Sequence, residues 1–238
     1  VKPASYTPIT CLELGKMLAE AGLPEGVYNV ITGPGAVVGD ALVKSPWVNA
    51  IAFTGETVTG KRLMAEAAQT LKKVSLELGG KSPMIVHSDA NLDRALDGAM
   101  EVFYNAGQVC NVPARLILHD QIYDEFMRRF VDRARSLKVG ATFDPAADMG
   151  PVVSESQLET VMGYIESGKK DGARLEAGGM RLEGGIYDKG YYVAPTVFSE
   201  VRPGMKIVDE EIFGPVAVTF VTGIWTRPSK SPTTRHMG

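Results

Sequence analysis

The chain has 238 residues, 45% of them hydrophobic and 22% charged, which is enough for one large globular domain or two small ones. Its 25 basic and 28 acidic side chains give a net charge of −3 with no basic block, so nucleic acid is not an expected partner, and no apolar run is long enough to span a membrane. Two cysteines are too few for a disulfide framework, and no secretory signal opens the chain, which together favour a reducing compartment such as the cytoplasm.

The first third of the chain alternates helix and strand signals. In chain order the patterns predict a helix over about 11–20 capped by Thr10, a strand over 27–31, a glycine-rich turn and helix ending near residue 44, a strand over 48–53, a helix to about 69, and a strand over 72–76. Strands that alternate with helices through short turns predict a parallel sheet covered by helices, and the right-handed crossover rule favours a doubly wound unit.

A second α/β block follows. The patterns predict strands over 84–86, 115–119, 191–198 and 216–221, helices over about 91–104, 122–137 and 154–171, and a loop or hairpin over 178–190. The break between the two blocks is expected near Glu77.

Cys110 and Glu77 are the candidate catalytic pair. A thiolate can attack an aldehyde carbonyl, and a carboxylate can later activate water against the resulting thioester. Gly107 and Gln108 are expected to break the preceding helix, which would place Cys110 on an exposed loop. The two residues are 33 positions apart (110 minus 77), which is too far for a local motif, so the fold would have to bring them together.

Each candidate also has a simpler interpretation. A free cysteine is often a small buried hydrophobic residue, as we expect for Cys11 within a helix. Glu77, which precedes Gly79 and Gly80, could be a solvated loop carboxylate or could project into a cleft that the paired glycines leave open.

Two glycine turns have the strand–turn–helix context that suits a dinucleotide. They carry Gly33, Gly35 and Gly39 in the first turn, and Thr54, Gly55 and Gly60 in the second. Neither matches the G-x-G-x-x-G fingerprint, so the pattern alone is a weak signal. The three histidines lack the spacing of metal ligands, and no metal site is expected.

Six segments together resemble the NAD(P)-dependent aldehyde dehydrogenase superfamily. They read V-K-P-A-S-Y-T-P at 1–8, F-T-G-E-T-V-T-G at 53–60, L-E-L-G-G-K-S-P at 76–83, G-Q-V-C at 107–110, D-M-G-P-V-V-S at 148–154 and E-E-I-F-G-P-V at 210–216. The likeness runs to about residue 220. It implies part of a doubly wound Rossmann-type dinucleotide domain over 1–78 and part of an α/β catalytic domain over 79–221.

By this resemblance, Cys110 is the nucleophile and Glu77 the general base in the oxidation of a small aldehyde to a carboxylic acid, with NAD or NADP as cofactor. The intermediates would be a thiohemiacetal and a thioester, and the backbone N–H of Cys110 would donate to the oxyanion. The resemblance also implies cofactor contacts, in chain order, from Lys2 (adenosine ribose), Gly35 (adenine side), Thr54 and Gly55 (pyrophosphate), Leu78 (nicotinamide), and Glu211 and Phe213 (nicotinamide ribose and ring).

The sequence departs from the family pattern at two cofactor positions. Ser5 stands where many NAD-preferring members carry a glutamate that binds the ribose hydroxyls, so the 2′-phosphate of NADP would not be repelled. Glu56 replaces the commoner serine, and its carboxylate would compete with a phosphate for the helix amides. Some family members that oxidise semialdehydes also carry this glutamate, which favours that substrate class.

Family members are much longer than this chain, and Val1 is not Met, so we expect a protein truncated at both ends. The missing parts would hold the second oxyanion donor, an asparagine worth about 10²–10³ in rate, and surfaces of a homodimer or homotetramer. Residues 222–238 leave the family pattern, and we expect them to be poorly packed. Codons can be chosen for this tail such that a one-base shift of the reading frame gives a family-like sequence, so the tail is interpreted as a frameshift product. The alternative is a tail encoded by a cloning vector.

Two further interpretations stay open from the sequence. The chain could be a non-catalytic remnant that keeps a partial dinucleotide site. Alternatively, Cys110 could hydrolyse esters without a cofactor.

Overall fold

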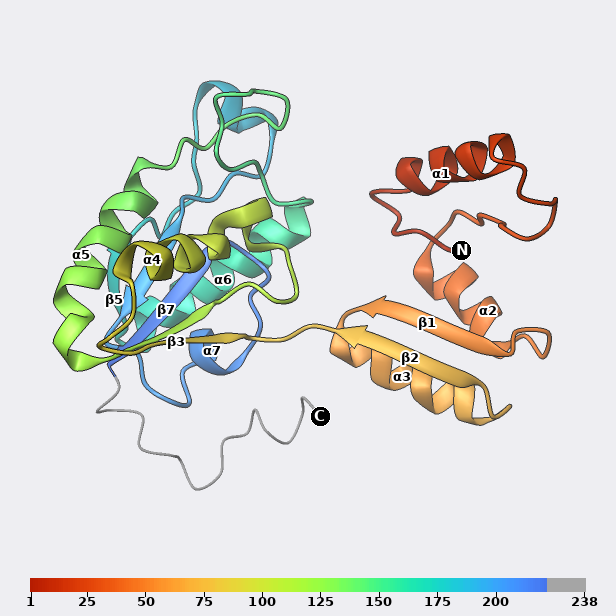
Figure 1. Cartoon of the computed structure of the whole chain (residues 1–238), viewed down its shortest axis with the longest axis horizontal. Coiled ribbons are helices and arrows are strands. Elements are labelled where there is room, and N and C mark those ends of the chain that lie inside the picture. Colours follow the sequence, from red (N-terminus) through yellow and green to blue (C-terminus); the bar gives the residue numbers. More distant parts are fainter. Residues whose placement is uncertain (222–238) are drawn as a thin grey trace. The chain divides into compact units, whose positions relative to one another are not determined.

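The computed structural model describes residues 1–221, and the chain divides into two compact units, Val1–Gly79 and Gly80–Gly238 (Figure 1). The division falls within the paired glycines that follow Glu77. Parallel strands alternate with helices in both units, so the α/β class expected from the sequence is confirmed. Within residues 1–221, no helix has the length and apolar character needed to cross a membrane.

The first unit is built around two parallel strands. Its elements are α1 (Ile9–Glu20), the π-helix η1 (Gly35–Gly39), α2 (Asp40–Lys44), β1 (Ala50–Gly55), α3 (Thr57–Ala68) and β2 (Lys73–Leu78). The strands pair in register, with Thr54 opposite Glu77 and Gly55 opposite Leu78. Helix α3 is the crossover between them, and Gly60 makes room on that helix for the Leu78 side chain. The carboxyl ends of both strands therefore lie together.

Two local predictions in this unit are wrong. The strand predicted over residues 27–31 does not form, because none of the strands in residues 1–221 pairs with this segment; its Ile31 amide donates instead to the Val1 carbonyl at 2.9 Å. Helix α1 begins at Ile9 with Pro8 as its N-cap, so Thr10 is inside the helix and does not cap it. Proline suits this position because its missing N–H is not needed in the first turn.

The second unit holds a five-stranded sheet in the order β3-β4-β7-β6-β5, parallel except for the antiparallel pair of β5 with β6. Its elements are β3 (Pro83–Val86), α4 (Leu92–Met100), the 3₁₀ segment η2 (Glu101–Gly107), β4 (Arg115–Leu118), α5 (Asp120–Ser136), α6 (Glu155–Lys170), β5 (Arg174–Ala177), η3 (Gly185–Lys189), β6 (Thr196–Ser199), α7 (Lys206–Asp209) and β7 (Val216–Val221). Strand β7 is the central strand, paired with β4 along one edge and with β6 along the other.

Helices cover both faces of this sheet (Figure 1). Phe198 of β6 lies against Gly168 of α6, whereas its neighbour Ser199 lines a groove with side chains of α5. Successive strand residues point to opposite faces, so α5 and α6 lie on opposite sides of the sheet. Helix α5 packs against α4, and α6 packs against α7.

Aromatic side chains fill the core beneath α5. Phe126 and Phe130 are fully buried, and the Phe130 ring lies 5.9 Å from Phe103 and 6.0 Å from Phe126, measured between ring centroids. The two α5 residues are four positions apart and therefore share one helix face. This cluster joins α5 to η2, the segment that precedes Cys110.

The sequence missed β5 and α7, and it overextended β6. The strand predicted over 191–198 pairs with the sheet only over Thr196–Ser199, because Pro195 has no N–H to donate to a ladder. Before Pro195 the chain turns to the predicted loop region instead, where Ala194 donates to the Met180 carbonyl at 3.0 Å. Residues 222–238, which we expected to be poorly packed, lie outside the described residues.

Replacing Phe130 with alanine should lower the free energy of unfolding by about 3–5 kcal/mol, because it empties a large buried volume. The matched control is Phe143→Ala, since Phe143 is 99% exposed, and it should change stability by less than about 0.5 kcal/mol. Urea unfolding followed by circular dichroism measures both variants. Equal losses in the two variants would contradict the packing described for α5.

Candidate active site

The predicted site residues fall into two groups, one in each unit. The first unit holds Lys2, Ser5, Gly35, Thr54, Gly55, Glu56, Glu77 and Leu78, and the second holds Cys110, Glu211 and Phe213. Glu77 and Cys110 thus belong to different units, and their meeting stays a prediction.

The first group gathers at the carboxyl ends of β1 and β2. Thr54 and Gly55 end β1, while Glu77 and Leu78 end β2 directly beside them in the parallel register. Ligands of open α/β sheets bind at this edge of the strands. The sequence alone could not align these two pairs, because they are 23 residues apart (77 minus 54).

Helix α3 begins at the same edge. Glu56 is its N-cap residue, but no side chain accepts a hydrogen bond from the first-turn amides; instead the Glu56 carboxylate accepts from the Thr59 hydroxyl at 3.4 Å. Free amides at the start of a 12-residue helix suit a phosphate group. The competition expected from Glu56 for these amides is therefore not seen in this structure.

The start of the chain lies against the glycine-rich turn. A Cβ built on Gly35 would lie 4.0 Å from Nζ of Lys2, and that ammonium donates to the Pro3 carbonyl at 2.9 Å. The Ser5 hydroxyl donates to the Gly33 carbonyl at 3.5 Å. The fold thus brings Lys2 and Ser5 to the glycine-rich turn of Gly35, which is about 30 positions further along the sequence.

Cys110 lies on a turn after η2, and its side chain is exposed, as the helix-breaking residues before it predicted. Two reciprocal hydrogen bonds hold this turn: Asn105 Nδ2 donates to the Gln108 carbonyl at 3.2 Å, and Gln108 Nε2 donates to the Asn105 carbonyl at 3.0 Å. The Gln108 side-chain oxygen also accepts from the Val153 amide at 2.8 Å. The exposed thiol is therefore carried by a well-anchored backbone. By contrast, Cys11 is half-buried within α1.

The backbone before Cys110 is strained. Asn105, Ala106 and Gly107 all have positive φ angles, of 49°, 55° and 73°. An alanine in the left-handed region is unusual and persists only where its surroundings enforce it. Gly107 is required by packing as well, because a Cβ built on it would lie 2.0 Å from the Gly214 carbonyl oxygen.

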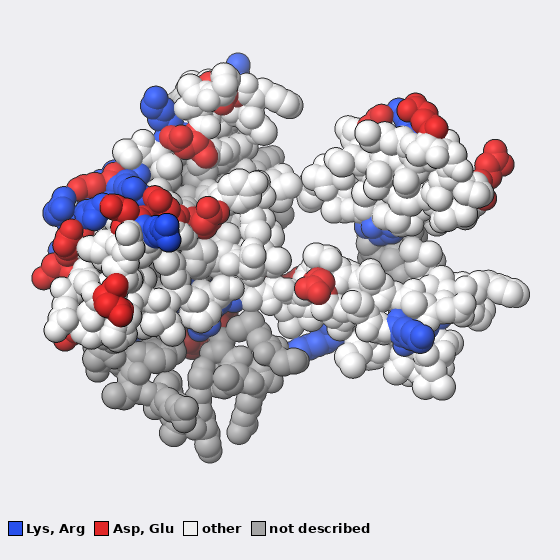
Figure 2. All heavy atoms as spheres, viewed as in Figure 1, with Lys and Arg blue, Asp and Glu red and all other residues white. Residues whose placement is uncertain are grey.

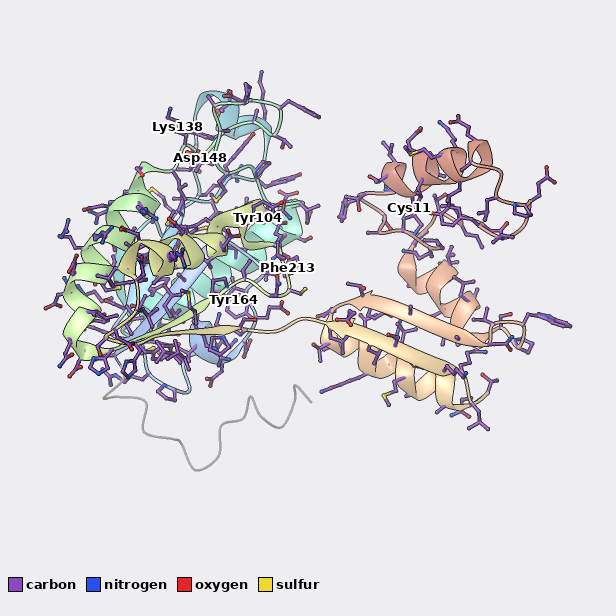
Figure 3. The ribbon with its side chains drawn as sticks, in the orientation of Figure 1. Cys11, Tyr104, Lys138, Asp148, Tyr164 and Phe213 are labelled. Carbon is purple, nitrogen blue, oxygen red and sulfur yellow. The ribbon has the colours of Figure 1, made fainter. Side chains whose placement is uncertain are left out.

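The segment Glu210–Phe213 forms the other part of this group. Phe213 is a non-glycine residue with φ of 53°, and 39% of it is exposed. Gln157 Nε2 donates to the carbonyls of Ile212 at 3.1 Å and of Phe213 at 2.9 Å, and Tyr164 Oη donates to Glu210 Oε2 at 2.7 Å. Figure 3 labels Tyr164 and Phe213, which both belong to the second unit.

Lys81 is a buried cation that the sequence did not single out. Only 3% of the residue is exposed, and its Nζ has no hydrogen-bond partner among the described residues. Burial and the nearby Arg115 guanidinium lower the pKa of Lys81 to about 7, although the carboxylates of Glu211 and Asp209 act in the opposite direction. The only sequence feature that could have pointed to Lys81 is its place in the L-E-L-G-G-K-S-P segment at 76–83, and that segment does not indicate which of its side chains are buried.

A small cavity joins these segments within the second unit. Its walls include Lys81, Gly107, Val109, Glu211 and Phe213, and its volume is about 10 Å³. That space holds one water molecule at most, so neither an aldehyde nor a nicotinamide fits inside it. The cavity shows instead that Glu211 and the residues before Cys110 pack against a common interior.

Several charged and imidazole side chains that the sequence left unassigned contact one another and not the candidate site. The basic residues of α5 alternate with acidic residues on the surface, where Arg129 pairs with Asp93 and Arg133 pairs with Asp97 (Figure 2). His87 and His119, isolated in the sequence, lie 5.1 Å apart between ring centroids. Residues 1–221 nevertheless contain no group of three or more His, Cys, Asp or Glu side chains that could hold a metal ion.

Comparisons with known proteins agree with this arrangement. The model of the Aldehyde dehydrogenase family matches residues 1–222. Retinaldehyde dehydrogenase 3 of Homo sapiens is 49% identical over 219 residues, and Aldehyde dehydrogenase, mitochondrial, of Leishmania tarentolae is 49% identical over 218 residues. Each match covers 91% of this chain, but only 42% and 43% of those proteins, so the chain spans less than half of their length.

Solved structures give the same result. The NAD+ complex of an aldehyde dehydrogenase from Bacillus cereus has a TM-score of 0.89 and 45% sequence identity to this chain, and the match covers 92% of this chain and 44% of that one. A putative aldehyde dehydrogenase from Burkholderia cenocepacia reaches a TM-score of 0.90 at 39% identity.

The burial of Lys81 predicts a pH-dependent stability. Between its folded pKa of about 7 and its ordinary value of 10.5, the unfolded chain holds the proton and the folded chain does not. The contribution of Lys81 to the free energy of unfolding should therefore rise across this window and stay at its low level below about pH 7. Lys81→Met should be stabilised relative to the native chain most strongly near pH 7, and this difference should shrink toward pH 10.

Urea unfolding at a series of pH values measures this difference. Lys206→Met, at an exposed lysine of α7, is the control and should show no such trend. A constant difference between Lys81→Met and the native chain from about pH 7 to pH 10 would disprove the assignment.

Proposed function

Because the chain belongs to the aldehyde dehydrogenase family, we propose that it takes part in the oxidation of an aldehyde to a carboxylic acid, with NAD+ or NADP+ as the oxidant. The observation that carries this proposal is the exposed Cys110 thiol on an anchored, strained turn, packed through Gly107 against the segment that holds Glu211 and Phe213. Strain of this kind is concentrated at functional sites.

Cys110 is the proposed nucleophile. Its deprotonated Sγ forms a bond to the carbonyl carbon, and the aldehyde oxygen becomes an oxyanion to which the Cys110 backbone N–H would donate. Loss of hydride from this thiohemiacetal leaves a thioester on Cys110. The nicotinamide supplies the hydride acceptor when it is bound.

Glu77 is the proposed general base of the second half-reaction. Its carboxylate takes a proton from water as the water oxygen attacks the thioester carbon, after which the C–S bond breaks and the acid leaves. Its place at the carboxyl end of β2, beside the end of β1, supports this role because ligands approach parallel sheets from that edge.

The first unit fits a dinucleotide. Thr54, Gly55 and the uncapped start of α3 would hold the pyrophosphate, and Lys2 with Gly35 would hold the adenosine part. Glu211 and Phe213 of the second unit would hold the nicotinamide ribose and ring. The Bacillus cereus relative was solved as an NAD+ complex, which supports this class of cofactor.

Two details bear on specificity. Ser5 offers a hydroxyl and no carboxylate beside the glycine-rich turn, so a 2′-phosphate would meet no negative charge there, and we propose that NADP+ is accepted as well as NAD+. Glu56 at the start of α3 favours a semialdehyde substrate by resemblance. The cytoplasmic location expected from the sequence stays a prediction, since one relative bears the name mitochondrial.

A second candidate function is dinucleotide binding without catalysis. It is favoured by the first unit, where Thr54, Gly55 and the uncapped start of α3 suit a dinucleotide without any contribution from Cys110. Cofactor-free ester hydrolysis by Cys110 is the third. Binding of NAD+ without turnover would support the second, and ester hydrolysis unchanged by NAD+ would support the third.

Variants of the proposed pair test the mechanism. Cys110→Ala should reduce NADH formation from an aldehyde and NAD+ by about 10⁴-fold or more, because no thiohemiacetal can form. The matched control is Cys11→Ala, which changes the other cysteine and should leave the rate unchanged. Absorbance of NADH measures the rates, and equal losses in the two variants would exclude Cys110 as the nucleophile.

Glu77→Gln should separate the two half-reactions. Steady-state turnover should fall by about 10²–10⁴-fold, because water is no longer activated. A rapid burst of NADH, stoichiometric with the enzyme, should remain because thioester formation does not need the Glu77 base. Stopped-flow absorbance resolves the burst, and its disappearance would place Glu77 in the first half-reaction instead.

A further inference from the structure

Helix α6 holds the loop that carries Glu211 and Phe213 at two points. We infer that Tyr164 and Gln157 are positioning residues, which hold the Glu210–Phe213 loop in the conformation that receives the cofactor ribose; this inference rests on the proposed function. Neither residue is part of the segments that carry the family resemblance.

The first contact is the hydrogen bond from Tyr164 Oη to Glu210 Oε2, at 2.7 Å. Tyr164 is half-buried, while Glu210 is exposed. Burial, followed by the bond to Glu210, raises the pKa of Tyr164 to about 12, so the hydroxyl keeps its proton and remains a donor throughout the physiological pH range. The acceptor carries a charge, which strengthens the bond.

The second contact is made by the amide of Gln157. Its Nε2 group donates to two successive carbonyls, those of Ile212 and Phe213, at 3.1 and 2.9 Å. Gln157 and Tyr164 are seven residues apart, which is two turns of α6, so they project from the same face of the helix. Together they hold the loop on both sides of Glu211.

The loop conformation requires such contacts. Phe213 is held at φ of 53°, a conformation that a phenylalanine adopts only under constraint. The next residue, Gly214, lies flush against α6, because a Cβ built on it would be 2.4 Å from Cγ2 of Val161. Without the two side-chain contacts, the backbone of Phe213 would be free to relax.

The same helix also reaches the nucleophile segment. Val153, just before the α6 N-cap Ser154, donates its amide to Gln108 Oε1 at 2.8 Å. Gly107 packs directly against the Gly214 carbonyl oxygen. Helix α6 thus fixes the cofactor loop and the Cys110 turn to one rigid element, which keeps their separation constant.

The test compares Tyr164→Phe with Ser167→Ala in the full chain. Both changes remove one hydroxyl from α6, but Ser167 bonds to Asp171 and does not touch the loop. Hydrogen exchange measured by mass spectrometry should show the amides of residues 210–214 exchanging roughly fivefold faster in Tyr164→Phe, by the loss of one charge-assisted hydrogen bond. Amides of α5 that exchange by local opening should be unaffected in both variants.

Conservative variants of Glu210 show whether the bond itself is responsible. Glu210→Gln keeps an acceptor for Tyr164 and should keep the slow exchange, whereas Glu210→Ala should reproduce the fast exchange of Tyr164→Phe. In the Glu210→Ala background, adding Tyr164→Phe should have no further effect. Equal exchange rates in the native chain, Tyr164→Phe and Ser167→Ala would overturn the inference.

Cofactor binding tests the second half of the inference. Tyr164→Phe should raise the KM for NAD+ roughly fivefold and leave the KM for the aldehyde unchanged, because the contacts proposed for the loop are to the cofactor ribose and ring and not to the aldehyde. An unchanged KM for NAD+ together with faster exchange would reject the role in cofactor binding. If the native chain neither binds nor reduces NAD+, the proposed function fails, while the exchange rates still decide whether α6 holds the loop.

Discussion

Gly107 lies so close to the carbonyl oxygen of Gly214 that no side chain fits between the two backbones. This contact joins the turn before Cys110 to the segment that holds Glu211 and Phe213, and the rest of the candidate site in the second unit depends on it. The strain at Asn105 and Ala106 is a consequence, since the chain must leave η2 in the left-handed region to reach this position. The aromatic core beneath α5 resists relaxation of that strain, because Phe103 of η2 packs on Phe130.

The two units contribute different chemistry. The first gathers backbone groups at the carboxyl ends of β1 and β2 and at the start of α3, which suits the phosphates of a dinucleotide. The second presents the exposed Cys110 thiol on an anchored turn, and it buries Lys81 at a small cavity that Gly107 and Glu211 also line. The division between the two units falls between Gly79 and Gly80.

Much of the fold could be predicted from the sequence because its signals are local. The helices around Phe126 and Ile165 follow apolar side chains at helical spacing, and β7 follows a run of β-branched and aromatic residues. The strand predictions that were wrong depended on whether a pairing partner was available. The strand predicted over 27–31 lacked a partner beyond Val1, and the end of the β6 prediction was cut short by Pro195. Helix α7 is only four residues long, which is below the length at which periodicity is informative.

The sequence by itself determined the α/β class and most of the longer helices and strands, the choice of Cys110 and Glu77 as candidates, and the family, because these are carried by short segments read along the chain. Only the tertiary structure decided that Lys81 is buried, that Gly107 meets Gly214, and that α6 holds the loop after Glu210. The physical reason is separation: Tyr164 and Glu210 are 46 residues apart, and Gln157 and Ile212 are 55 apart. No local pattern encodes a contact between groups that only the packing of a helix against a loop brings within hydrogen-bond distance.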